Sequence, residues 1–199
     1  MRGRDTDTAF SHDVLRTVIL DTYIRCWGVP EQRVQSRKGE ETIEVYFFRK
    51  DSAGVRRVST VGLSTILRKS AGHHGFELFM VLPNDFGGAS VTEVSNFLLD
   101  VAVYSLRDDV HIDVGATIPE TPLMPKSWNA KALLLDEPRG EREELESIPI
   151  GQENVRPLWL IPIYEAELRL IEKQGIAEFD KRVDASEWSL ADPNRPATV

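Results

Sequence analysis

Apolar residues recur along the chain with two different periods, and each period predicts one type of element. Helical spacing predicts helices over residues 11–27, 91–106, 164–175 and 176–183. Short alternating or continuous apolar runs predict strands over residues 43–49, 55–61, 76–82, 110–118, 130–135 and 158–163. Two further stretches, 31–41 and 62–75, are expected to be loops because they show neither period.

The helix predicted over 91–106 is expected to lie buried at the centre of the fold. Ser90 and Glu93 have the spacing of a capping box, in which two side chains satisfy free amide groups at a helix start. Beyond them, one apolar stripe contains Phe97 and Val101, and a second contains Leu99. A helix that is apolar on most of its sides is buried.

The order of the predicted elements indicates the fold class. It reads helix, hairpin, strand, helix, strands, helix, which is not the regular strand–helix alternation of a parallel α/β fold. We therefore expect an α+β fold with a mixed, largely antiparallel sheet, packed with a buried central helix and flanking helices. One domain is expected over residues 12–185, between a flexible N-terminus, 1–11, and a disordered tail, 186–199.

Composition narrows the class of protein. The chain has 199 residues, of which 41% are apolar and 28% charged, as in ordinary globular domains. Its one cysteine, Cys26, excludes a disulfide within the chain and a zinc site built from cysteines. The sequence has no apolar leader and no uncharged apolar stretch of about 18 residues, so we expect a cytoplasmic protein without membrane contact.

Two residues on the strand predicted over 110–118 are candidate metal ligands. His111 and Asp113 lie two positions apart, so both side chains would face the same side of a sheet. Together with His73 or His74 they would supply the nitrogen and oxygen ligands of a metal-dependent hydrolase. The competing interpretation is a solvated polar face beside a loop histidine pair. We favour it, because the sequence contains no HExxH motif.

Sequence motifs of other catalytic classes are absent. The chain has no Gly-x-Ser-x-Gly elbow, and the pair Gly87-Gly88 lacks the lysine and hydroxyl residue of a phosphate-binding loop. The GxGxxG pattern of dinucleotide-binding folds does not occur either. We therefore expect no catalytic residues, no enzymatic activity and no cofactor.

Charge is the feature that suggests a partner. The net charge of −8 argues against nucleic-acid binding, which needs clustered lysine and arginine, and is compatible with a basic protein partner. Residues 136–153, called the acidic segment below, hold seven acidic and two basic residues, for a charge of −5. Tryptophan is enriched in binding hot spots, and Trp128 lies in a proline-rich loop. The candidate partner contacts are therefore Trp128, Asp136, Glu137, Glu141, Glu143, Glu144 and Glu146.

Four stretches of the chain carry a family resemblance. They are TVGLS at 60–64, ELFMVLP at 77–83, LLDVAVY at 98–104 and LWLIPIYEAE at 158–167. In this order they resemble the suppressor of fused family in its short bacterial single-domain form. The resemblance implies the fold and a protein-binding role, since the animal member grips a transcription factor and bacterial relatives are regarded as immunity proteins. It transfers no catalytic residues.

These observations lead to one hypothesis and two alternatives. The hypothesis is a non-enzymatic protein-binding module, an immunity-type protein that neutralises a basic toxin by covering it. One alternative is the metal-dependent hydrolase built on His111 and Asp113. The other is a scaffold that binds an extended peptide by strand addition along an exposed sheet edge.

Overall fold

The computed structural model describes residues 3–38, 41–67, 75–107, 109–120 and 124–199. Its helices are α1 (Gly3–Trp27), α2 (Leu63–Leu67), α3 (Val91–Tyr104), α4 (Glu165–Gln174) and α5 (Ile176–Asp184). Its strands are β1 (Pro30–Lys38), β2 (Glu41–Phe48), β3 (Val55–Val61), β4 (Phe76–Pro83), β5 (Thr117–Ile118), β6 (Ala132–Asp136), β7 (Ile148–Ile150) and β8 (Glu153–Ile163). Two short 3-10 turns are η1 (Phe86–Gly88) and η2 (Glu143–Leu145).

The strands form one large mixed sheet, which confirms the predicted fold class. Its order is β1-β2-β3-β4-β8-β6-β5, and β7 pairs with β8 beside this path. The β4–β8 pair is parallel and the other pairs are antiparallel. Parallel neighbours need a long crossover, and here the chain between them contains α3, β5 and β6.

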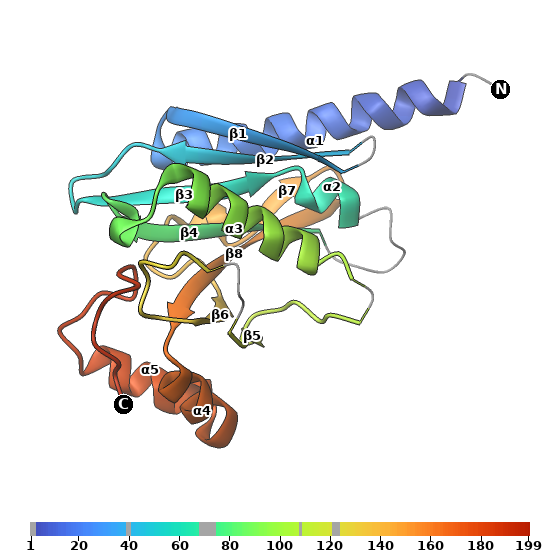
Figure 1. The fold of residues 1–199 in the computed structure, drawn as a ribbon. Helices are drawn as coiled ribbons and strands as arrows, with labels where there is room; N and C mark the ends of the chain where they lie inside the picture. The colour runs from blue at the N-terminus through green and yellow to red at the C-terminus, as the bar shows by residue number, and fades with distance from the viewer. Residues whose placement is uncertain (1–2, 39–40, 68–74, 108, 121–123) are drawn as a thin grey trace.

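Helices cover both faces of the sheet, which explains the continuous apolar run of β2. Val45 and Phe47 point into the core shared with α3, while Tyr46 and Phe48 point into the core shared with α1. Figure 1 shows α3 in front of the sheet and α1 behind its upper part. A strand that is buried on both faces has no polar side, and its sequence therefore loses the alternation of a half-exposed strand.

A third core lies at the lower end of the sheet, where α4 and α5 pack (Figure 1). Trp159 and Ile161 of β8 meet Leu168 of α4 and Phe179 of α5 there. The helix α3 packs one face against the sheet through Phe97, Leu98 and Val101, while Val103 and Tyr104 of its other face are exposed. Its capping box forms as expected, with Ser90 and Glu93 exchanging hydrogen bonds between side chain and backbone.

Three predictions about elements were wrong. Residues 31–41 were expected to be a loop, but most of them form β1, an edge strand whose Val34 packs against a core. The strand predicted over 110–118 is a strand only at Thr117–Ile118. A turn interrupts the run, because the Ala116 amide donates to the Asp113 carbonyl and Gly115 has a φ of +83°. The loop expected after Gly62 begins with α2.

The chain ends also differ from expectation. The first helix begins at Gly3 rather than at residue 11. The tail expected to be disordered instead packs against the fold, and Arg195 is only 2% exposed. Its guanidinium forms two hydrogen bonds with the carboxylate of Glu167, at 2.7 and 2.9 Å. None of the described helices is long and apolar enough to cross a membrane.

Candidate partner-binding site

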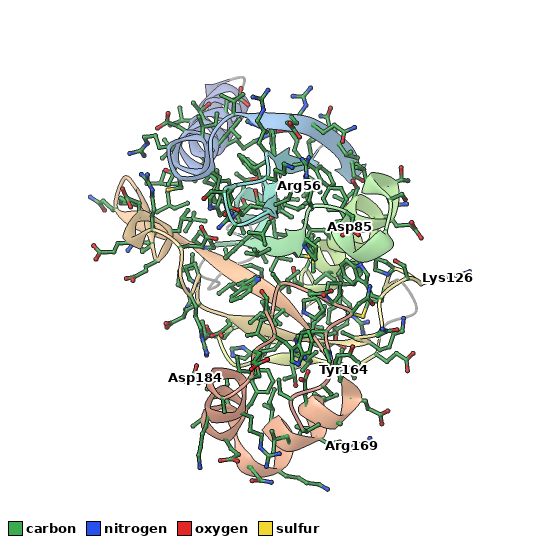
Figure 2. The ribbon with its side chains drawn as sticks, turned by 90° about the vertical axis from the view of Figure 1, so that its left-hand side faces the viewer. Arg56, Asp85, Lys126, Tyr164, Arg169 and Asp184 are labelled. Carbon is green, nitrogen blue, oxygen red and sulfur yellow. The ribbon has the colours of Figure 1, made fainter. Side chains whose placement is uncertain are left out.

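The acidic segment is an ordered excursion between β6 and β8 that contains η2 and β7. Leu145 and Ile148 anchor it, because both are buried in the core that α1 covers. The segment projects from the left side of the molecule in Figure 2. A few apolar anchors thus hold a mostly charged stretch of chain against the back of the sheet.

Three of the seven predicted contact residues are not available to a partner. Trp128 is 1% exposed, packs edge-on against Phe97, and donates its indole N–H to the Phe86 carbonyl at 2.8 Å. Asp136 is buried beside Arg139, with its Oδ2 atom 2.6 Å from the guanidinium Nε, and burial raises its pKa. Both residues were predicted to be contacts, and for both the prediction was wrong because they are part of the interior.

Glu141 is the third such residue, and it ties the acidic segment to the body of the protein. Its carboxylate accepts the indole N–H of Trp27 at 2.7 Å and lies 2.9 Å from Nε of Arg57. The side chain is 8% exposed. Glu141 therefore serves the fold, by joining the segment to α1 and β3.

The other four predicted contacts are exposed: Glu137, Glu143, Glu144 and Glu146. Two of them, Glu137 and Glu146, line an open groove of about 340 Å³. The remaining lining residues are mainly apolar or prolines, namely Val114, Pro138, Ser147, Arg156, Pro157 and Leu158. The groove thus combines apolar and proline residues with two carboxylates and one arginine, a mixture found in protein-binding surfaces.

The predicted metal ligands do not converge within the described residues. His111 is exposed, and the turn at Gly115 removes the strand that would have aligned it with Asp113. Hydrogen bonds from the Val114 amide and from Arg156, the latter at 2.9 Å, hold the pKa of Asp113 below its usual value. His73 and His74 lie outside the described residues, and the described part holds no group of three potential metal ligands. Asp113 instead pairs with the arginine at the rim of the groove.

A buried carboxylate that the sequence analysis did not single out organises the turn after β3. Glu77 is fully buried, and its two oxygens accept five hydrogen bonds within 3.3 Å. The donors are the hydroxyls of Thr60 and Ser64 and the amides of Gly62, Leu63 and Ser64. Burial raises the pKa of Glu77, while these donors oppose the shift.

This network requires glycine at position 62 and gives Ser64 a structural role. Gly62 has a φ of +108°, and a Cβ atom there would lie 2.6 Å from the Thr42 carbonyl oxygen. Ser64 donates its hydroxyl to Glu77 at 2.7 Å and is 0% exposed, so its oxygen is closed to a substrate. The stretches 60–64 and 77–83, which carry the family resemblance, are therefore two halves of one buried structural unit.

The comparisons with known proteins agree with this fold. The family model "Suppressor of fused protein (SUFU)" matches residues 39–196 of the chain. A SUFU homologue of known structure from Neisseria gonorrhoeae is 20% identical, with a TM-score of 0.72 over 93% of this chain and 97% of that chain. No curated protein sequence matches the chain.

Two further solved structures share the fold at lower identity. Drosophila Suppressor of Fused is 14% identical with a TM-score of 0.66, over 92% of this chain and 50% of that chain. A chain in the crystal structure of the Sufu-Fu complex is 15% identical with a TM-score of 0.60, over 85% of this chain and 82% of that chain. The fold is therefore found in a protein that has been crystallised in a complex.

Proposed function

The chain belongs to the suppressor of fused family, and from this premise we propose that it is a non-enzymatic protein-binding module of the immunity type. In this proposal it neutralises a basic toxin domain by binding it directly. The Sufu-Fu complex supports a protein-binding role for the fold. The net charge of −8 and the carboxylates of the acidic segment favour a basic partner.

The groove beside the acidic segment is the observation that carries this proposal. Glu137 and Glu146 would attract a basic surface from a distance, since carboxylates clustered on one side of a protein steer diffusional encounter. Val114, which is 37% exposed at the groove, would then supply the apolar contact, because Pro157 and Leu158 are themselves buried. Inhibition would require only that the partner's own active surface be covered.

Binding to the products of neighbouring genes tests the proposal. Each candidate toxin domain would be co-expressed with this protein, and survival of the host and co-purification of the complex would be measured. We expect one such domain to be toxic alone, harmless with this protein and retained in a stable complex. Failure of every neighbouring product to bind, or to be neutralised, would contradict the immunity-type role.

Two double variants that remove the same charge at different places locate the contact. Glu137→Gln combined with Glu146→Gln should slow association roughly tenfold at low salt, because rim charges act mainly on the association rate. Glu165→Gln combined with Glu172→Gln removes the same charge from exposed positions of α4 and is the matched control. Equal association rates for the two double variants would remove the groove from the interface.

One structural feature supports strand addition as a second candidate mode of binding. The nine-residue strand β1 lies at the end of the sheet, and β2 is its only strand partner among the described residues. Its outer edge could pair with an extended segment of a partner. Charged side chains such as Glu31 and Arg33 are also the usual protection of an edge strand against pairing, so we place this mode second.

A further inference from the structure

One tryptophan of this protein is held open to solvent. Trp188 follows α5 in the C-terminal segment and is 54% exposed, whereas Trp128 and Trp159 are 1% and 8% exposed. Trp27 is partly buried in its contacts with Phe48 and Phe79. Within the described residues, Trp188 belongs to none of the three cores. The fold therefore does not use this indole for its stability.

Two exposed carboxylates precede Trp188 in the chain, and helix α5, which ends at the first of them, contacts the acidic segment. Asp184 and Glu187 are both exposed and stand within four residues of the indole. One helical turn before Asp184, the carboxylate of Asp180 pairs with Arg139 of the acidic segment through contacts of 2.7 and 3.2 Å. Figure 2 places Asp184 on the side of the molecule from which the acidic segment projects.

We propose that Trp188, together with Asp184 and Glu187, forms a second contact for the basic partner and takes an arginine or lysine side chain of it. The indole face attracts a cation and covers its aliphatic stem, while the two carboxylates balance its charge. Tryptophan at such a position is the residue type most enriched in interface hot spots. This inference rests on the proposed function, and it extends the contact from the groove across Arg139 and Asp180 to the end of α5.

Residues 180–188 hold three acids and the two bases Lys181 and Arg182, and Arg182 is already paired with Glu178 at 3.1 Å, so the stretch has a small negative charge. An exposed indole alone would suit any apolar pocket, but Asp184 and Glu187 would be desolvated without compensation by an apolar or acidic partner. A guanidinium or ammonium group removes this penalty, because it pairs with the carboxylates while it stacks on the ring. The patch therefore selects for basic side chains beside an apolar surface.

A labelled deca-arginine peptide tests the patch on the whole protein. Its fluorescence anisotropy would be measured at low salt against wild type, Trp188→Ala and Trp188→Phe. We expect Trp188→Ala to weaken binding roughly threefold to tenfold and Trp188→Phe to restore part of it, since phenylalanine keeps a weaker aromatic face. The peptide should also protect wild-type fluorescence from acrylamide, and this protection should be absent in Trp188→Ala.

Charge variants separate the patch from the overall negative charge. Asp184→Asn combined with Glu187→Gln should weaken peptide binding more than Glu165→Gln combined with Glu172→Gln, which removes the same charge elsewhere. Identical affinities for wild type and Trp188→Ala, with equal effects of the two double variants, would overturn the inference.

The patch and the proposed function can fail separately. If a toxin domain is neutralised equally well by wild type and by Trp188→Ala, the immunity-type role stands and the patch is wrong. If no neighbouring product binds but the peptide loses affinity in Trp188→Ala, the patch stands and the identity of the partner is wrong.

Discussion

Glu77 illustrates how a charged residue can be fully buried without marking a reactive site. A buried carboxylate is tolerated when its oxygens are saturated with donors, and here five donors converge on it from the turn after β3. Two of them are hydroxyls, of Thr60 and Ser64, and three are backbone amides. The geometry makes them structural donors.

We predict that Glu77→Gln destabilises the protein by about 2–4 kcal/mol. The amide group would place donors against the backbone N–H groups of Gly62, Leu63 or Ser64, which then lose an acceptor in the interior. Urea unfolding followed by circular dichroism measures the change. The matched control is Glu172→Gln on the exposed surface of α4, which should unfold at the wild-type midpoint. Equal midpoints for both variants would contradict the structural role.

At the scale of elements, the sequence predicts the helices and strands that bury many apolar side chains. It misses a strand whose existence depends on its position in the sheet. The helix α3 and the strands β2 and β4 were predictable because each buries several apolar side chains, and β3 was predictable as the second strand of a hairpin. The strand β1 was missed because it lies at the edge of the sheet and its sequence is mostly polar. Its apolar residue Val34 packs against the core, but one such residue gives no apolar pattern.

The candidate site was only partly predictable for a related reason. The charge of the acidic segment is a property of the sequence, but its division into buried and exposed carboxylates is not. Glu141 has a salt-bridge partner, Arg57, that lies 84 residues away, so local pattern could not reveal it. Local pattern also favoured Trp128 as a contact, because it does not show the pocket that encloses this indole, and it did not single out Trp188, which is exposed.

The C-terminal strap, residues 190–198, is an element without regular structure that the fold requires. Asn194 accepts the amide of Asn129 and donates to the Gly87 carbonyl, so it joins two distant loops. Thr198 donates to Glu167, which also accepts both contacts from Arg195. A buried and bidentate arginine–carboxylate pair thus fixes the strap to the start of α4.

We predict that Glu167→Gln destabilises the protein by about 3–5 kcal/mol at pH 7, because it leaves Arg195 buried without its counter-charge. Burial raises the pKa of Glu167, but hydrogen bonds from Arg195, Tyr164 and Thr198 outweigh this and lower it overall. A carboxyl with a lowered folded pKa stabilises the protein above its unfolded pKa, about 4.3, and that contribution is lost as pH falls through the folded value.

The pH dependence gives this prediction its control. The difference in unfolding free energy between wild type and Glu167→Gln should be largest near neutral pH and should narrow as the pH falls below about 4.3. Urea titrations across this range measure it. The exposed variant Glu172→Gln should follow wild type throughout. A Glu167→Gln deficit that stays constant with pH would mean that the pair is not ionised in the folded protein.

At the scale of the whole molecule, charge and apolar surface have separate roles. The large apolar side chains on both faces of the sheet are buried in three cores. Four glutamates of the acidic segment are exposed to solvent. Figure 2 places Asp184 of α5 on the side from which the acidic segment projects, and Asp180 of the same helix pairs with Arg139 of that segment. A surface organised in this way acts first on the rate at which a partner arrives, and only at contact on how long it stays.

Salt therefore distinguishes the two binding modes. Raising ionic strength from about 0.01 M to about 1 M shortens the range of electrostatic attraction from about 30 Å to about 3 Å. For electrostatic capture by the acidic surface, stopped-flow measurement should show an association rate that falls at least roughly tenfold, while the dissociation rate changes little. Strand addition along β1 relies on backbone hydrogen bonds, so its association rate should be nearly independent of salt. A flat salt dependence would thus move the interface from the acidic segment to the sheet edge.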